Sequence, residues 1–407
     1  MSTVTLTGSL NLLRSSGTSC ENMDFITKAN IKGKIVLLRE DLNSDVNKGK
    51  VLMSERIKQS SESVKFLKKK SAKVVIIAHQ GRPGGEDFTS MEQHAKLLSK
   101  FTKVNFIPDI IGEKAEIAIK NLKDGEAILL DNVRNLKDEF SEEDTDFVKK
   151  LSSWCNVYVN DAFSVSHRSQ ASIVGFPKHM KSYAGPLLEK EVKALQKISL
   201  KNCLYILAGA KPADDINLLK KNKVLACGLF GQMCISATGK KLGAQDEYLK
   251  KTISDYDKSL TDLKSRLGEV GSLVKTPVDF GVKDEKGKRK DVALEDFPVN
   301  YEIFDIGPKT QKIYLDEIKK AKSIYMKGPA GYYLDPQFIQ GTKALLTAVA
   351  KSKAFSLLGG GQLNEAIDRS KIPKKKFGYI SLSGGALLDY VAGKRLPGLE
   401  VLGYYKD

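Results

Sequence analysis

The chain repeats one unit along most of its length: a short apolar run rich in Val, Ile and Leu, a turn with Gly, Asp or Asn, and a helical stretch. Runs that are apolar at successive positions predict strands buried on both faces, as in parallel sheets covered by helices. Their alternation with helices predicts the α/β class. The expected strands are 34–38, 73–78, 127–130, 156–159, 203–208, 223–227, 323–326, 354–358 and 379–382, and the expected helices include 54–70, 91–101, 213–221, 309–320 and 336–351.

One helical stretch, 184–198, interrupts this rhythm near the middle of the chain. Because 407 residues exceed one ordinary core, we interpret it as the connector between two doubly wound, Rossmann-like parallel-sheet domains. The lysine-rich stretch 283–291 is expected to be an exposed loop of the second domain. The predicted limits are 1–22 for a disordered extension, 23–181 for the N-terminal domain, 182–198 for the interdomain helix, 199–388 for the C-terminal domain and 389–407 for a tail that returns to the N-terminal domain.

The net charge of +17 comes mostly from lysines scattered along the helical stretches. That distribution predicts a solvated basic surface that attracts anionic small molecules. A nucleic-acid site would need a basic patch interleaved with aromatic residues, and 374–379 is the nearest stretch of that kind, but it is short. We therefore expect no nucleic-acid partner.

The cysteines and the N-terminal residues give information on the cellular compartment of the protein. Five cysteines show neither a CxxC pair nor zinc-ligand spacing, which predicts reduced thiols and a cytoplasmic protein. No apolar run approaches the ~20 residues of a membrane span, so we expect no membrane partner. Residues 1–22 are poor in acidic residues and rich in Ser and Thr. They are open to two interpretations, a transit-like leader or an extension ahead of a second start at Met23.

Different residue types follow the predicted strands in the two halves, at the sheet edge where open α/β sheets bind ligands. The first half places arginines, histidines and short polar residues there. Guanidinium groups bind phosphate or carboxylate through two parallel hydrogen bonds, so these arginines indicate a small, highly anionic metabolite. The second half places glycines, which let backbone N–H groups approach a polyphosphate, and one lysine, Lys211, behind a glycine turn.

Each of these features also has a plainer interpretation when it is taken alone. A single arginine can form a surface salt bridge, His79 can be a hydrogen-bonded structural residue, and 359–361 can be an ordinary turn. Only their ordered combination indicates a site. The chain contains no GxxxxGK[ST] stretch and no GxGxxG after a strand, which argues against a P-loop and against an ordinary dinucleotide domain.

A series of motifs, in order along the chain, resembles the phosphoglycerate kinase family. They are GKIVLLREDLN, SERIKQS, AHQGRP, LLDNVR, VNDAFSVSHRSQAS, AGAKPADDI, KGPAGYY, LLGGGQ and SGGALLDYVAGKRLPG, and the last is most similar to the archaeal branch. The resemblance runs from about Ile31 to Leu402. It implies a phosphotransferase of glycolysis and gluconeogenesis that moves a phosphoryl group reversibly between 1,3-bisphosphoglycerate and ADP, giving 3-phosphoglycerate and ATP. The alternatives are a non-catalytic phosphoglycerate-binding homologue and a basic nucleic-acid-binding protein on the same fold.

The resemblance also implies the site residues. On the substrate side they are Asp41, Leu42, Asn43, Arg56, His79, Gln80, Gly81, Arg82, Arg134 and Arg168. On the nucleotide side they are Gly209, Ala210, Lys211, Gly228, Gly328, Pro329, Gly331, Asp335, Gly359, Gly360, Gly361 and Gln362. Arg56 and Lys211 are implied to be catalytic, although Arg56 on its own would be taken for a surface residue at a helix start. Mg²⁺ would accompany ATP or ADP, held mainly by the phosphates, and the protein would be a monomer whose cleft closes by hinge bending.

The chain departs from the common family pattern at four nucleotide-side positions. Asp215 stands where many relatives have a second lysine, and Lys327 stands where they have Asn before Gly-Pro. Leu334 replaces the ribose-binding Glu, with Asp335 beside it, and Gln362 replaces an Asp near the metal. These changes motivate the non-catalytic alternative and leave the choice between ATP and GTP open. One hypothesis is that Lys327 supplies the positive charge lost at Asp215.

Overall fold

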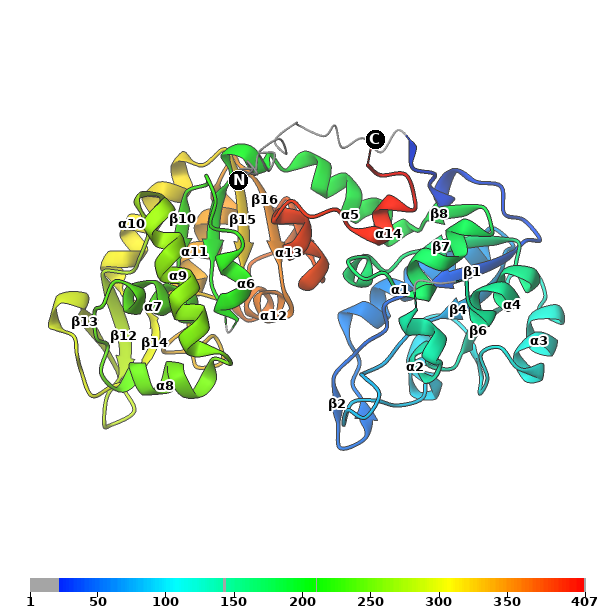
Figure 1. Ribbon diagram of the computed structural model, residues 1–407, viewed down its shortest axis with the longest axis horizontal. Helices are drawn as coiled ribbons and strands as arrows, with labels where there is room; N and C mark the ends of the chain where they lie inside the picture. The colour runs from blue at the N-terminus through cyan, green and yellow to red at the C-terminus, as the bar shows by residue number, and fades with distance from the viewer. Residues whose placement is uncertain (1–21, 142–143, 210, 406–407) are drawn as a thin grey trace, which may run out of the picture.

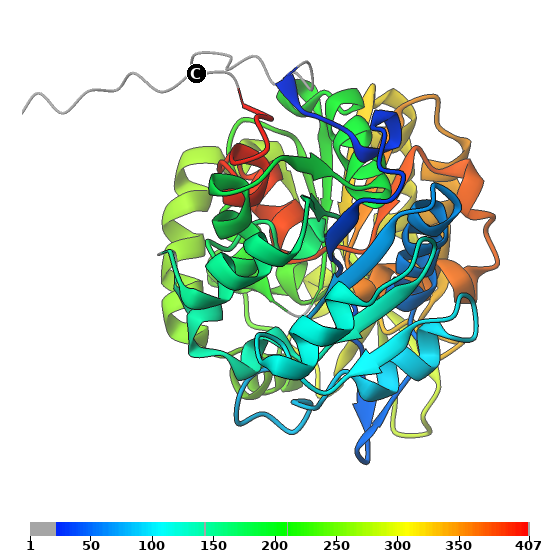
Figure 2. The same ribbon diagram turned by 90° about the vertical axis from the view of Figure 1, so that its right-hand side faces the viewer.

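The structure is a computed structural model that describes residues 22–141, 144–209 and 211–405 (Figure 1). The predicted extension therefore lies almost entirely outside the described residues. Two six-stranded sheets form two lobes, and all strand pairs within each sheet are parallel. The view in Figure 2 has the N-terminal lobe in front of the C-terminal lobe. None of the described helices is both long enough and apolar enough to span a membrane.

The N-terminal sheet has the strand order β5-β6-β4-β1-β7-β8. Alternate residues of β1 point to opposite faces: Val36 and Leu38 pack in the core with α1 and α2, whereas Leu37 packs in the core with α3 and α4. The strands are β1 (Ile35–Arg39), β4 (Lys73–Ile77), β5 (Asn105–Ile107), β6 (Ala127–Leu130), β7 (Val157–Asn160) and β8 (Ser182–Ala184), and the helices are α1 (Glu55–Lys69), α2 (Glu92–Leu98), α3 (Glu113–Lys120) and α4 (Asp146–Trp154).

The C-terminal sheet has the order β11-β10-β9-β15-β16-β17. Ile206 of β9 packs with α10 and α11, whereas Tyr205 and Leu207 pack with α7 and α9. The strands are β9 (Leu204–Leu207), β10 (Val224–Ala226), β11 (Val274–Lys275), β15 (Ser323–Lys327), β16 (Phe355–Gly359) and β17 (Tyr379–Ser381). The helices are α6 (Pro212–Ile216), α7 (Gly228–Ala237), α8 (Ala244–Thr252), α9 (Tyr256–Val270), α10 (Pro308–Lys320), α11 (Gln340–Lys351), α12 (Gly361–Ser370) and α13 (Gly385–Val391). Helices on both faces of both sheets confirm the doubly wound α/β fold.

All nine predicted strands are present, each within one residue of its expected ends. Four expectations were wrong. The helix expected at 91–101 ends at Leu98, and the helix expected at 336–351 begins at Gln340. The helix expected at 213–221 ends at Ile216, because the chain turns there with hydrogen bonds from Leu218 N to Asp215 O and from Leu219 N to Ile216 O. The stretch 283–291 contains the facing ends of two antiparallel strands in addition to an exposed turn. These belong to a small sheet of β12 (Asp279–Lys283), β13 (Arg289–Ala293) and β14 (Ile303–Ile306).

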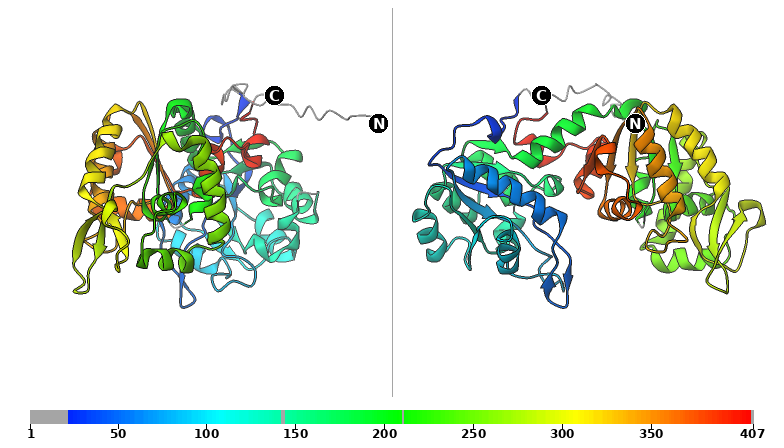
Figure 3. Two further views of the ribbon diagram at one scale, coloured as in Figure 1. Left: turned by 60° about the vertical axis from the view of Figure 1, so that its left-hand side comes forward. Right: turned by 180° about the vertical axis from the view of Figure 1, so that it is seen from behind.

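Helix α5 (Pro186–Lys197) runs between the two lobes, as the right panel of Figure 3 shows. It begins at Pro186, four residues later than the start of the predicted interdomain segment, because Ser182–Ala184 pairs with β7 as an edge strand. The Asp161 carboxylate accepts hydrogen bonds from the first amides of α5, Leu187 N and Leu188 N, at 2.7 and 2.8 Å.

The C-terminal segment crosses back to the N-terminal lobe (Figure 1). Helix α14 (Pro397–Glu400) lies there, where Gly398 N donates to Ser166 O at 2.9 Å and Leu399 is fully buried. The tail therefore contributes to the core that covers α5. The exact domain limits stay a prediction.

Candidate active site

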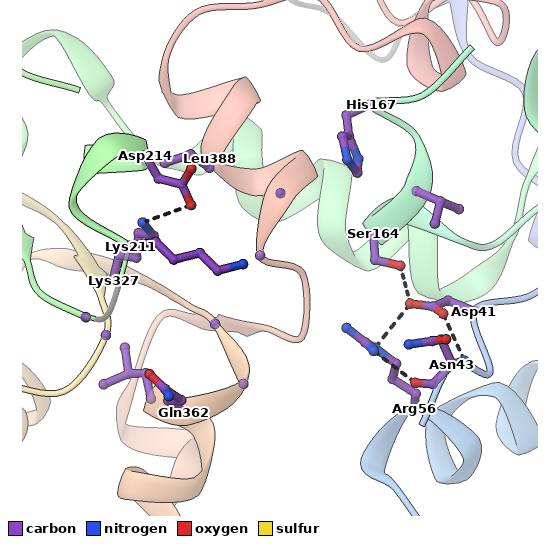
Figure 4. A pocket seen from close by; sticks show the side chains of 18 of the residues that line it. Asp41, Asn43, Arg56, Ser164, His167, Lys211, Asp214, Lys327, Gln362 and Leu388 are labelled. Atoms are coloured by element: carbon purple, nitrogen blue, oxygen red, sulfur yellow. Dashed lines mark hydrogen bonds and ion pairs between the residues drawn. The ribbon is translucent and has the colours of Figure 1, made fainter. Parts of the chain in front are cut away.

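A cavity of about 530 Å³ lies between the lobes, at the carboxyl ends of strands from both sheets (Figure 4). This is the edge where the fold class places ligands. Of the predicted residues, the N-terminal lobe contributes Asp41, Asn43, Arg56, His79 and Arg168, and the C-terminal lobe contributes Gly209, Lys211, Gly328, Gly360, Gly361 and Gln362. Residues separated by more than 300 positions thus face one space.

Arg56 is anchored by groups from both lobes. Its Nε lies 3.1 Å from Asp41 Oδ2, and its Nη1 donates to Asn43 O at 2.9 Å. Its Nη2 donates to the Leu382 carbonyl, which follows β17 of the C-terminal sheet, at 3.2 Å. Arg56 lies in the first turn of α1, as expected, but its guanidinium reaches into the cleft (Figure 4). Its neighbours therefore make it a cleft residue, which its position in the sequence alone did not indicate.

Asp41 is ionised although it is only partly exposed. Burial opposes its charge, but the Arg56 guanidinium and a hydrogen bond donated by the Ser164 hydroxyl outweigh that cost and lower its pKa. Asn43 N also donates to Asp41 Oδ1 at 3.1 Å, and Asn43 Oδ1 accepts from Gly81 N at 2.8 Å. These bonds hold the carboxylate and the amide at the cavity wall.

His79 is a neutral donor. Burial and the charge of the fully buried Arg39 hold its pKa well below the usual range. Arg39 Nη2 lies 3.2 Å from His79 Nδ1, and because a guanidinium can only donate, Nδ1 must accept. A neutral imidazole that accepts at Nδ1 carries its proton on Nε2. His79 therefore offers an N–H group for an anionic ligand.

The arginines of the N-terminal lobe form a cluster of like charges. Burial and the charges of Arg168 and Arg39 lower the pKa of Arg134 to about 10. Burial and the charge of Arg82 likewise lower the pKa of Arg168. Arg134 and Arg168 both stay protonated near neutral pH, so the repulsion between their charges is present in the folded protein. An anion bound beside them would relieve that repulsion.

Several predicted substrate residues do not line the cavity itself. Leu42 is fully buried, and Gln80 is bonded to the backbone of Ser44 at 2.9 Å. Arg134 donates to the Gly81 carbonyl. These residues support the wall from behind, and neither Gly81 nor Arg82 is among the lining residues.

The C-terminal wall is built from tight glycine turns. Gly328 follows β15 with φ +77°, and a Cβ there would lie 2.2 Å from the Ala208 carbonyl oxygen. Only glycine permits this close approach of two strand ends. Lys211 lies just beyond the neighbouring turn, and its side chain extends into the cavity toward the N-terminal lobe (Figure 4). Ala210, another predicted residue, lies outside the described residues.

The charged departures from the family pattern meet at this wall. Lys327 Nζ lies 2.7 Å from Asp215 Oδ1 and 3.9 Å from Asp214 Oδ2. Burial raises the pKa of Asp215 to about 7, although the Lys327 charge opposes the rise. Lys327 and Asp214 both line the cavity.

A second cavity of about 460 Å³ adjoins the first and shares Gly209 and Gln362 with it. Its lining includes the predicted residues Gly228, Pro329 and Gly331, and apolar side chains that could pack on a nucleobase, among them Leu229, Phe304, Tyr332 and Leu334. Asp335 lines neither cavity, because its Oδ1 accepts from Gln337 N at 2.9 Å. Gly359 lines neither, since it is buried at the end of β16.

Some lining residues were not assigned individual roles from the sequence. Ser164 and His167 lie within a quoted motif but were not assigned roles, and Gly384 and Gly385 follow β17 as the other glycines follow their strands. Nothing in the sequence around Asp214 indicated that it would line the cavity. Among the described residues, no three His, Cys, Asp or Glu side chains gather in a way that could hold a metal ion. The oxygen-bearing side chains on the nucleotide side of the cavity are those of Asp214 and Gln362.

Known proteins resemble the chain over most of its length. The family model described as phosphoglycerate kinase matches residues 26–394. The phosphoglycerate kinase of Methanothermus fervidus is 41% identical over 393 residues, which cover 91% of this chain and 94% of that protein. The one from Sulfurisphaera tokodaii is 39% identical over 94% of this chain and 96% of that protein. The crystal structure of phosphoglycerate kinase from Pyrococcus horikoshii superposes with a TM-score of 0.86 at 36% identity, over 94% of this chain and 99% of that one.

Proposed function

The chain belongs to the phosphoglycerate kinase family, and from that premise we propose how its cleft performs the family's reaction. The enzyme is a phosphotransferase that moves a phosphoryl group between 1,3-bisphosphoglycerate and ADP, giving 3-phosphoglycerate and ATP. The observation that carries the proposal is a single cavity with an arginine-bearing wall from one lobe and a glycine wall with Lys211 from the other. No relative described above supports a non-catalytic role.

The N-terminal wall binds the phosphoglycerate. Arg168 and the arginines behind it attract its phosphate, and the Nε2 proton of His79 is available to one of its oxygens. Asp41 and Asn43 accept hydrogen bonds and are suited to the substrate hydroxyl. This arrangement places charge-assisted hydrogen bonds at the anionic ends of a small ligand.

The C-terminal wall binds the nucleotide. Backbone N–H groups at the glycine turns approach the phosphates, and the adjoining apolar cavity takes the base. Mg²⁺, which commonly binds through phosphates and one or two carboxylates, would be held chiefly by the nucleotide and would neutralise phosphate charge. Asp214 and Gln362 are the side chains of this wall whose oxygens could add to its ligands.

The transfer needs positioning more than covalent chemistry. A β-phosphate oxygen of ADP forms a new bond to the phosphorus of the acyl phosphate, and the bond to the carboxyl oxygen breaks, so that 3-phosphoglycerate leaves as a carboxylate. Arg56 and Lys211, one from each wall, stabilise the equatorial oxygens of the transferring group. Closing the lobes brings the walls together and excludes water.

Further features of the protein follow from this assignment. We place it in the cytoplasm, in keeping with the four buried cysteines, 155, 203, 227 and 234, which are unpaired thiols. We also infer that it works as a monomer in glycolysis and gluconeogenesis, in keeping with a site whose two walls both come from one chain.

The test is phosphoryl transfer from ATP to 3-phosphoglycerate, measured in steady state with and without Mg²⁺ in the parent and in Lys211→Ala. We expect Mg²⁺-dependent turnover of roughly 10 s⁻¹ or more in the parent. Loss of one preorganised charge should lower kcat by on the order of 10²–10³ in the variant. A parent that binds 3-phosphoglycerate tightly but turns over neither ATP nor GTP would overturn the proposal.

A further inference from the structure

We propose that Lys327 is a phosphate-binding residue of the nucleotide site and that the buried carboxylate of Asp215 positions it there. The inference rests on the proposed function in one respect, namely that a nucleotide polyphosphate occupies the glycine-lined wall of the cavity. It assigns Lys327 and Asp215 a joint role in that wall.

The backbone places Lys327 beside the phosphate turns. It is the last residue of β15 and lies in register with Leu207, the last residue of β9. Its carbonyl accepts from Ala208 N at 2.8 Å, and Gly328 follows at once with its close approach to Ala208. Lys327 and Lys211 therefore emerge from adjacent strand ends into the same cavity (Figure 4).

The side chain of Lys327 is held in place by Asp215. Asp215 is fully buried, and the side chain of Lys327 is 17% exposed, so the 2.7 Å contact between them is shielded from solvent. A shielded pair is screened less by salt than an exposed one. The more distant and half-exposed Asp214 lies on the same side at 3.9 Å. The ammonium is thus fixed at the cavity wall before a ligand binds.

The pair leaves the ammonium with bonding capacity. An ammonium has three N–H donors, and Asp215 accepts one of them. Asp215 Oδ2 has no hydrogen-bond partner within the part of the chain that the structure describes, so Lys327 is its only close cation there. The remaining donors of Lys327 can turn toward the cavity, where a polyphosphate is the ligand with enough oxygens and charge to use them.

A purely structural ion pair is the competing interpretation, and another pair in the same lobe shows what that would look like. Lys275 Nζ lies 3.0 Å from Glu317 Oε1, a glutamate whose side chain is 10% exposed, but Lys275 does not line the nucleotide cavity. Lys275→Met is therefore a matched control, because it breaks a lysine–carboxylate pair of similar length away from the proposed site.

The experiment measures binding of ADP, ATP and adenosine by calorimetry in the parent, Lys327→Met, Asp215→Asn, the double variant and Lys275→Met. We expect Lys327→Met to weaken ADP and ATP by roughly 10–100-fold, the worth of a hydrogen bond to a charged group, and to leave adenosine within about twofold. In kinetics the KM for nucleotide should rise and the KM for 3-phosphoglycerate should not.

Asp215→Asn tests positioning. It should weaken ADP by roughly 3–10-fold in the parent background and add nothing once Lys327 is methionine, because residues acting through one contact are not additive. The double variant carries no unpaired buried charge, so it keeps the test valid if Lys327→Met alone folds poorly. The double variant should still bind ADP weakly. Lys275→Met should bind ADP with the same affinity as the parent.

Three results would overturn the inference. The first is unchanged ADP affinity in both Lys327→Met and the double variant, which would leave the pair a structural contact. The second is an equal loss of adenosine and ADP affinity. The third is an Asp215→Asn variant that binds ADP as well as the parent or better. A parent that binds no nucleotide at all would instead contradict the proposed function, so the two failures are distinguishable.

Discussion

At the scale of single residues, the N-terminal wall is defined by positive charges held near each other. Arg168 lines the cavity, whereas Arg134 and Arg39 lie behind it and bond to protein groups. Burial and like charge both lower the pKa of Arg168. The wall is therefore preorganised for an anion, and its members should differ in how directly they affect substrate binding.

Replacing Arg168 by methionine should raise the KM for 3-phosphoglycerate by roughly 10–100-fold, because a charge-assisted hydrogen bond to the substrate is lost. The KM for nucleotide should stay within about twofold. Initial rates with each substrate varied in turn give both constants. The control is Arg369→Met, which breaks an exposed pair with Glu365 at 3.0 Å. Equal rises in both KM values would contradict a substrate-side role.

The sequence was enough to predict the charged residues that line the cavity, but it was not enough to predict the residues that contact and support them. Arg56, His79 and Lys211 could be assigned because the resemblance marks them, and all three line the cavity. Ser164 and Asp214 could not, since a serine and an aspartate have many uses and only the folded chain brings them to Asp41 and Lys327. Asp335 was predicted because it lies beside the position of the ribose-binding Glu, but its carboxylate is used by the local turn.

At the scale of elements, continuous apolar runs identified the parallel strands because burial on both faces demands them. The small antiparallel sheet was not predicted, since Val292 is the one buried residue of β13 and three of its other residues are charged. Such a strand has the composition of a loop. The short β5, β8 and β11 also escaped because two or three residues carry too little periodicity to recognise.

The meeting of β9 and β15 depends on Gly328. In Gly328→Ala the new methyl group would collide with a backbone carbonyl, which cannot move as a side chain can, and a positive φ adds about 1–2 kcal/mol of strain. We expect a lower free energy of unfolding and at least tenfold weaker ADP binding, with 3-phosphoglycerate binding retained. Denaturant unfolding and calorimetry measure both.

The control for that variant is Gly268→Ala in helix α9, where a new Cβ meets nothing within 4 Å. It should raise stability by about 0.5–1 kcal/mol, because alanine favours a helix over glycine. ADP affinity that is unchanged in Gly328→Ala would show that the turn tolerates a side chain.

Helix α5 carries a buried acid at the connection between the lobes. Glu191 Oε2 accepts from Tyr379 Oη of β17 at 2.8 Å, and burial raises the pKa of Glu191 from 4.5 to about 7. A raised carboxyl pKa means that the folded state favours the proton. This contribution to stability is complete below pH 4.5 and is lost as the pH rises to about 7.

Glu191→Gln removes that titration. Relative to the parent, the variant should gain stability between pH 4 and pH 8 by on the order of 3 kcal/mol at most. Denaturant unfolding at several pH values measures it. Glu189→Gln on the same helix should instead lose stability relative to the parent as the pH rises over this range. The reason is that Lys193 and Thr27 outweigh burial and lower the pKa of Glu189. If the free energy of unfolding of Glu191→Gln varied with pH in parallel with that of the parent, the raised pKa of Glu191 would be contradicted.

At the scale of the whole molecule, the two walls sit on separate lobes joined through α5 and the returning tail (Figure 3). Near the cavity the lobes are bridged by polar contacts, such as Arg56 Nη2 to Leu382 O and Glu191 to Tyr379, and by apolar packing of Phe163 with Leu387 and Leu388 of α13. The polar contacts can rearrange at little cost, whereas the buried apolar packing of α14 keeps the tail attached. We therefore expect the lobes to move as rigid units.

Closure should require both ligands, because the proposed function assigns one ligand to each wall. In small-angle X-ray scattering, we expect the radius of gyration to fall when 3-phosphoglycerate and a non-transferable ATP analogue are both present, and to change less with either alone. Arg56→Met should reduce the fall, since Arg56 contacts both lobes and lines the cavity between them. Arg369→Met, on the surface of the C-terminal lobe, should compact as the parent does. An unchanged radius in the ternary complex would mean that the cleft acts without closing, and water would then have to be excluded by the ligands themselves.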